Sequence, residues 1–222
     1  MQDWIRSLSP RSEFVVVIGL AFGWALLSSL QSVLSGAPAQ TDAAYTFSAA
    51  DLWSVLIVEL TVIAMLGYFL RLRGWTMAHF GPPAQAGDAV PALVLVAASI
   101  LSYQLLATLA LSSGTALKPA QTTPDVGWTA ILATSAVNGF YEEIFVCGYV
   151  LVALRERWGL WPAIHVSTAI RVAYHLYQGS AGVLGIVPLG LLFAGWYART
   201  GRLWPVILAH VLLDVIALAA LA

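Results

Sequence analysis

The sequence predicts an all-α membrane protein, a polytopic bundle of about seven transmembrane helices. Of its 222 residues, 60% are hydrophobic and 9% are charged, and the mean hydropathy is +0.84. Soluble domains carry about 25% charged residues, so this chain has too few charges to cover a surface that faces water. The apolar residues also gather in long runs, and the basic residues lie at alternate ends of these runs.

Seven apolar stretches have roughly the 20 residues that a membrane-spanning helix needs. Short connections, several with Pro or Gly, separate them, and no segment is long enough to form a second domain. We therefore expect one membrane domain over residues 1–222, with three spans in 1–124 and four in 125–222. The expected spans are residues 13–35, 51–71, 89–112, 127–153, 160–178, 182–198 and 203–221.

The basic residues predict the orientation of the chain. In a seven-span arrangement eight arginines fall on one side of the membrane, and Lys118 falls on the other. The eight are Arg6, Arg11, Arg71, Arg73, Arg155, Arg157, Arg199 and Arg202. Positive charge marks the cytoplasmic side, so we expect a cytoplasmic N-terminus and a C-terminus outside.

The first apolar stretch has a second interpretation. It could be a cleaved signal peptide, with Ala-Pro-Ala at 37–39 as the cleavage site. The stretch is long for such a peptide, so we favour a retained anchor. The orientation of the other six spans is the same in both cases.

Charge and cysteine content exclude several kinds of partner. The net charge of −1 argues against a nucleic-acid partner. A single cysteine excludes an intramolecular disulfide and a metal site built from several cysteines.

Six ionisable residues inside the expected spans form three pairs. A charge at the bilayer centre is unfavourable by about 2.5–3.5 kcal/mol, so such residues usually face the bundle interior and mark function. The second and third pairs are spaced four residues apart, which places each pair on one face of a helix. The pairs are Glu142 with Glu143, Arg171 with His175, and His210 with Asp214.

Two further ionisable residues in the spans have a structural interpretation. Glu59 lies alone near the middle of its span, where we expect a structural hydrogen-bonding group. His165 lies near the cytoplasmic end of its span, within reach of the lipid headgroups.

The paired groups suit hydrolysis of an amide. A carboxylate held near a histidine in a dry site can take a proton from water and return it to a leaving group. A histidine aimed at a carbonyl can stabilise the developing oxyanion. The same groups also suit a proton relay in a transporter, so the residue types alone leave both chemistries open.

Three motifs follow one another in the last four expected spans: EEIFVCG at 142–148, RVAYHLYQG at 171–179 and HVLLD at 210–214. Their order resembles the CAAX-protease and bacteriocin-processing family of intramembrane endopeptidases, and the resemblance covers about residues 125–220. The first three spans carry no motif.

The resemblance implies a role for each matching residue. It implies that Glu142 activates water, that His175 helps to hold this water, and that His210 with Asp214 forms the oxyanion side. Glu143 is the second glutamate of the family motif. We favour a mechanism without metal; if zinc is used, Glu142, His175 and His210 would bind it.

The sequence departs from the family pattern at two positions. Cys147 stands where the family has an arginine, so we expect Arg171 to replace that arginine and pair with Glu143. The last motif ends in Asp214 rather than asparagine. An ionised aspartate cannot donate a hydrogen bond to an oxyanion. Asp214 would therefore either be protonated, which a low-dielectric site can enforce, or orient His210 by accepting a hydrogen bond from it, and we favour the orienting role.

The sequence thus predicts an intramembrane endopeptidase, an integral protein of the bacterial cytoplasmic membrane. It would cleave a peptide bond near the membrane surface, in the membrane-associated tail of a protein or peptide substrate. One alternative is a non-catalytic family member with an immunity or scaffold role. Another is a proton-coupled transporter, for which we would expect an inverted repeat that the sequence does not display.

Overall fold

The computed structural model describes residues 2–35, 46–114 and 121–221 of the chain. Lys118 and the alternative cleavage site at 37–39 lie outside the described residues. The described part is an all-α bundle with one two-stranded parallel sheet, in which Thr46 pairs with Gln121 and Phe47 with Thr122.

The elements follow the predicted order closely. The main helices are α2 (Pro10–Leu34), α4 (Ala49–Leu72), α5 (Ala89–Ser112), α6 (Trp128–Glu142), α7 (Val150–Trp158), α8 (Leu160–His175), α9 (Gly179–Thr200) and α10 (Trp204–Leu221). The two short strands are β1 (Thr46–Phe47) and β2 (Gln121–Thr122). The short elements are α1 (Gln2–Ser7), four-residue or shorter 3-10 helices η1 (Met77–Phe80), η2 (Ala86–Asp88) and η4 (Leu176–Gln178), and a π-helix, η3 (Glu143–Tyr149).

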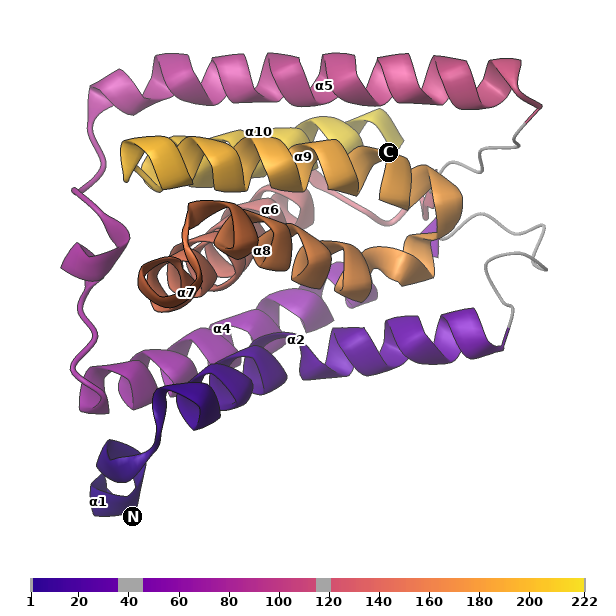
Figure 1. Cartoon of the computed structure of the whole chain (residues 1–222). Coiled ribbons are helices and arrows are strands. Elements are labelled where there is room, and N and C mark those ends of the chain that lie inside the picture. Colours follow the sequence, from indigo (N-terminus) through magenta and orange to yellow (C-terminus); the bar gives the residue numbers. More distant parts are fainter. Residues whose placement is uncertain (1, 36–45, 115–120, 222) are drawn as a thin grey trace.

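Six segments of the described chain are long and apolar enough to cross a membrane. The expected span at 160–178 is not among these six segments, because α8 has only 16 residues and continues as a single 3-10 turn. Figure 1 shows that α8 nevertheless runs alongside the other helices, in the direction opposite to α7. Successive long helices alternate in direction, so the two ends of the chain lie at opposite ends of the bundle.

Local sequence fixes where the helices begin and end. The Ser9 hydroxyl accepts the Ser12 N–H at the start of α2, and Ser48 forms a reciprocal capping box with Asp51 at the start of α4. Gly159 has φ 87° between α7 and α8, a conformation that glycine adopts without strain. This glycine lets the chain reverse its direction between α7 and α8.

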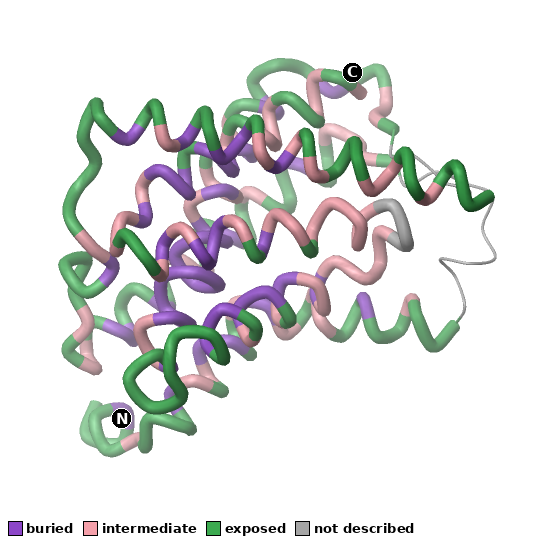
Figure 2. Tube along the Cα trace, turned by 45° about the horizontal axis from the view of Figure 1, so that its top comes forward, coloured by how far each residue is buried: buried purple, intermediate pink, exposed green. Residues whose placement is uncertain are grey.

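The continuous segment α6–η3–α7 forms the centre of the bundle. Within its most apolar window 72% of residues are buried, against 22–28% in the other five candidate spans. Figure 2 shows the buried residues gathered inside and the exposed ones on the outer helices. The exposed residues of α2 include large apolar ones such as Trp24, 85% exposed, as expected for a surface in contact with lipid.

Two buried acids form ion pairs between segments distant in sequence, at the end of the bundle where α2 begins and α4 and α9 end (Figure 1). Glu13 of α2 accepts hydrogen bonds from Arg73 Nε at 2.6 Å and from Trp75 and Tyr149. Asp88 pairs in the same way with Arg202, at 2.8 and 3.0 Å. Two of the arginines that predicted the orientation therefore also hold the loops at this end.

Candidate active site

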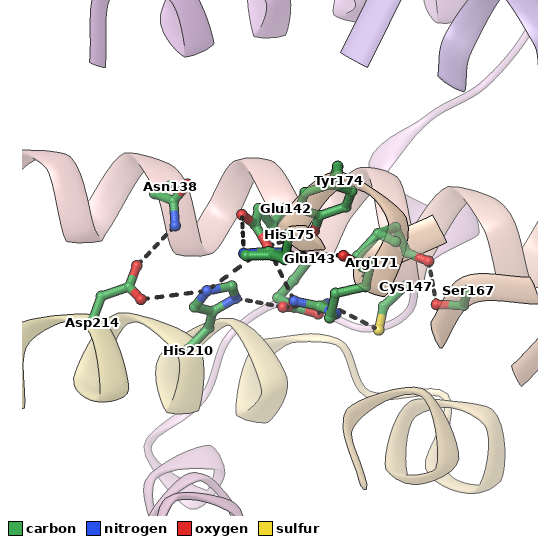
Figure 3. A network of polar contacts seen from close by, with 11 residues as sticks. Asn138, Glu142, Glu143, Cys147, Ser167, Arg171, Tyr174, His175, His210 and Asp214 are labelled. Carbon is green, nitrogen blue, oxygen red and sulfur yellow. Dashed lines mark hydrogen bonds and ion pairs between the residues drawn. The ribbon is translucent and has the colours of Figure 1, made fainter. Parts of the chain in front are cut away.

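Three helices bring the six predicted residues together inside the bundle (Figure 3). Glu142 is the last residue of α6, and Glu143 begins the π-helix η3. A π-helix is rare and often occurs at functional sites. The remaining four residues come from α8 and α10, which pack against this central segment.

A glycine lets α10 approach α6 closely. A Cβ atom added to Gly139 would lie 2.7 Å from Val211 Cγ2 and 2.9 Å from the Val211 backbone nitrogen. Only a residue without a side chain fits there. This close approach brings His210, the residue before Val211, within reach of Glu143.

The ion pair expected between Arg171 and Glu143 is present, and both side chains are buried. Arg171 Nη2 lies 2.6 and 2.7 Å from the two Glu143 oxygens, and Nη1 lies 3.1 Å from Glu142 Oε2. Cys147 Sγ is 3.9 Å from Nη2, so the guanidinium lies beside the residue that stands in place of the family arginine. The charge of Glu143 is thus balanced from the neighbouring helix.

His210 makes its short hydrogen bond with Glu143 and a longer ion-pair contact with Asp214. His210 Nδ1 lies 2.5 Å from Glu143 Oε1. Because a carboxylate paired with an arginine only accepts hydrogen bonds, Nδ1 must be the donor. Asp214 Oδ1 is 3.5 Å from His210 Nε2, and its other oxygen accepts a hydrogen bond from Asn138 at 2.8 Å. The hydrogen bond from His210 Nδ1 therefore goes to Glu143, and one oxygen of Asp214 is held by Asn138.

His175 and His210 each direct their Nε2 atom toward Glu142. His175 Nδ1 donates to the Arg171 carbonyl oxygen at 2.9 Å, which leaves Nε2 to face Glu142 Oε1 at 3.9 Å. His210 Nε2 lies 4.0 Å from the other oxygen, Oε2. These two gaps exceed hydrogen-bond distance, and a polar gap of this length is one that a water molecule can bridge.

The two oxygens of Glu142 have different surroundings. Oε2 accepts hydrogen bonds from the Tyr174 hydroxyl at 2.6 Å and from Arg171. In the part of the chain that the structure describes, Oε1 accepts no hydrogen bond, and His175 Nε2 lies 3.9 Å away. One oxygen is therefore fixed, and the other remains available on the side of His175.

The donor groups also suit a metal ion in principle. Glu142, Glu143 and His210 offer ligand atoms that lie within 4.8 Å of one another. Glu143 is already engaged by Arg171 and His210. The set expected from the sequence includes His175, which is not in this group, although its Nε2 lies 3.9 Å from Glu142 Oε1. Two histidines and a carboxylate bind zinc in hydrolases, and such histidines commonly donate their second N–H to a carbonyl or a carboxylate.

Sequence reasoning missed two residues of the site, Tyr174 and Asn138. Each had a positional signal: Asn138 precedes Glu142 by four residues on one helix face, and Tyr174 follows Arg171 by three. Glu59 is buried on α4, and its Oε2 has no hydrogen-bond partner among the described residues.

Comparison with known proteins identifies the region that carries this site. Residues 124–216 match the family model described as type II CAAX prenyl endopeptidase Rce1-like. No curated protein and no solved structure matches the chain. The matched region contains all three motifs and all six predicted residues. Residues 124–216 of the chain are therefore similar to the Rce1-like type II CAAX prenyl endopeptidases.

Proposed function

We propose that the protein is an intramembrane endopeptidase in which Glu142 activates water to cleave a peptide bond near the membrane surface. The family model that residues 124–216 match is one of proteases, and six apolar segments of the described chain are long enough to span a membrane. The observation that carries the proposal is the setting of Glu142. Its carboxylate lies between two histidine Nε2 atoms, with one oxygen fixed and the other available.

In the proposed reaction, a water molecule lies between Glu142 Oε1 and His175 Nε2. Glu142 removes a proton while the water oxygen bonds to the scissile carbonyl carbon, whose π electrons move to the carbonyl oxygen. His210, protonated on both nitrogens, donates from Nε2 to this oxyanion and from Nδ1 to Glu143. Glu142 then gives its proton to the amide nitrogen, the carbon–nitrogen bond breaks, and the amine leaves.

The remaining charged groups hold these two reacting side chains. Arg171 neutralises Glu143 and touches Glu142, so both carboxylates can stay buried. Asp214 has the most exposed side chain of the acids in the site, 26%, and Asn138 holds one of its oxygens. We infer that Asp214 faces the space through which the substrate reaches Glu142.

The substrate would be a protein or peptide with a membrane-associated tail, in the bacterial cytoplasmic membrane. The family description names prenyl endopeptidases that act on CAAX sequences. In such sequences a lipid-modified cysteine lies three residues before the C-terminus. A buried site within the bilayer suits a peptide that its own lipid holds at the membrane.

The test is cleavage by purified protein in detergent or liposomes. The probe is a fluorogenic peptide that ends in farnesylated Cys-Val-Ile-Met, with the unmodified peptide and a panel of other tail peptides beside it. Glu142→Gln keeps the shape of the side chain but removes the base, and we expect a loss of about 10²–10⁴ in kcat. Each reaction is run with and without a chelator.

The cleavage results distinguish a metal-free protease, a zinc protease and a non-catalytic protein. Cleavage that persists in chelator and disappears in Glu142→Gln supports the mechanism without metal, whereas loss in chelator that added zinc reverses supports the zinc site. Absence of cleavage for every peptide, together with a cellular phenotype that Glu142→Ala retains, would contradict an enzyme. A non-catalytic member of the family would then be the better description.

A further inference from the structure

We propose that Tyr174, supported by Phe22 of helix α2, is a positioning residue that aims the Glu142 carboxylate at its water. This inference rests on the proposed function of Glu142. The Tyr174 hydroxyl donates to Glu142 Oε2 at 2.6 Å, and the tyrosine is buried. Because Tyr174 occupies Oε2, Oε1 is the oxygen that remains on the side of His175.

The ring of Tyr174 contacts two other rings. It stacks on Phe22 with ring centroids 4.5 Å apart and an interplanar angle of 5°. Its centroid is also 4.5 Å from the His175 ring. One side chain therefore touches both the proposed base and the histidine that faces it, and a shift of this ring would move both partners of the water.

Arg171 cannot replace this contact. Its Nη1 reaches the same Glu142 oxygen at 3.1 Å, but its main partner is Glu143, on which Nη2 makes contacts of 2.6 and 2.7 Å. Without the tyrosine hydroxyl, Glu142 would keep one longer hydrogen bond from a group that is anchored elsewhere. Its carboxylate could then rotate about its last side-chain bond.

The support from Phe22 links the N-terminal part of the chain to the site. Phe22 is buried on α2, outside the 124–216 region that matches the family. α2 packs against α8, the helix that carries Tyr174 and His175. A helix without any motif would in this way contribute to the geometry of the catalytic groups.

The test compares Tyr174→Phe with a matched control, Tyr141→Phe. Tyr141 is also buried and also packs against Phe22, at 5.7 Å between centroids, but its hydroxyl donates to the Ala21 carbonyl oxygen and not to the site. Each variant removes one buried hydroxyl and keeps the ring. With the farnesylated peptide we expect Tyr174→Phe to lower kcat about 10- to 100-fold, with KM within twofold, since a hydrogen bond to a charged group is lost.

The control should keep kcat within about threefold. Phe22→Leu, which keeps an apolar side chain but removes the stacked ring, should lower kcat less than Tyr174→Phe and again leave KM unchanged. Equal loss in Tyr174→Phe and Tyr141→Phe would overturn the inference, because it would indicate general damage. So would full kcat in Tyr174→Phe.

A second measurement does not depend on turnover. The thermal midpoints of wild type, Tyr174→Phe, Glu142→Gln and the double variant form a double-mutant cycle. We expect the effect of Tyr174→Phe to be at least halved in the Glu142→Gln background, and no such coupling for Tyr141→Phe. Additive effects would overturn the inference. If wild type cleaves nothing while the coupling is present, the proposed function fails and the contact stands.

Discussion

At the scale of single residues, Glu143 joins the two halves of the site. Its oxygens accept from Arg171 on α8 and from His210 on α10, at 2.5–2.7 Å. The same carboxylate therefore balances the buried arginine and fixes the ring of the histidine that would stabilise the oxyanion. Glu142, its neighbour in sequence, is left with one oxygen for chemistry.

The pair of Arg171 and Glu143 makes the first residue-scale prediction. Arg171→Ala leaves two buried carboxylates without their cation, so we expect about 3–5 kcal/mol of destabilisation and loss of cleavage. Glu143→Gln in the same chain removes one of the two uncompensated charges, and it should recover part of the lost stability. The measurement is the thermal midpoint in detergent, with cleavage of the farnesylated peptide.

An exposed arginine provides the control for this pair. Arg157 is exposed at the end of α7, and Arg157→Ala should change the thermal midpoint little. If Arg171→Ala is as stable and as active as Arg157→Ala, the charge pair has no role. A double variant no more stable than Arg171→Ala would show that Glu143 is not the group that Arg171 neutralises.

The pairing could be predicted from sequence because buried charges need partners, and Arg171 was the only arginine or lysine in the interior of the expected spans. The hydrogen-bond partner of Asp214 could not be predicted from the sequence. His210 and Asn138 both lie within its reach, and which one it contacts depends on the distance between α6 and α10. Tyr174 was missed for a similar reason: the hydroxyl of a buried tyrosine usually finds a hydrogen-bond partner, but the sequence does not show which group it reaches.

At the scale of elements, the central segment and its contact with α10 shape the site. Hydropathy predicted one long span at 127–153, and the chain there is α6, a π-helix and α7 in continuity. The pattern could not predict the π-helix, because its hydrogen bonds depend on neighbours. The Ser167 hydroxyl of α8, for example, donates to the Val146 carbonyl oxygen inside η3 at 2.5 Å. Apolar content also made residues 160–178 look like a full span, although α8 is shorter.

Gly139 makes the prediction at this scale. In Gly139→Ala the new methyl group would lie 2.7 Å from Val211 Cγ2 and 2.9 Å from the Val211 nitrogen, so α10 must move away from α6. We expect about 1–3 kcal/mol of destabilisation and a fall in kcat, because His210 moves with Val211. The measurements are the thermal midpoint in detergent and the rate of peptide cleavage.

Gly67 provides the matched control, since it also lies within a long helix, α4, but a Cβ atom there has no neighbour within 4 Å. Gly67→Ala should be neutral or slightly stabilising, because alanine is the better helix residue. Wild-type stability and activity in Gly139→Ala would contradict the view that this close contact positions His210.

At the scale of the whole molecule, the alternating helices place the arginine-bearing ends together. α2 begins, and α4, α7 and α9 end, at the same end of the bundle, while α5 ends at the other (Figure 1). The sequence predicted this alternation well because hydropathy and charge act at the length of a whole span. The short α8 does not disturb it, since that helix still returns the chain toward the opposite end.

The orientation in the membrane makes the last prediction, and the single cysteine makes it measurable. Cys147 is fully buried, so it should react little with a membrane-impermeant maleimide. We expect Ser112→Cys, at the exposed end of α5, to be labelled in intact spheroplasts. Arg157→Cys, at the exposed end of α7, should be labelled only after the membrane is opened, because basic residues stay on the cytoplasmic side. Wild type provides the background labelling. If Arg157→Cys but not Ser112→Cys were labelled in intact spheroplasts, the orientation would be the opposite of the predicted one.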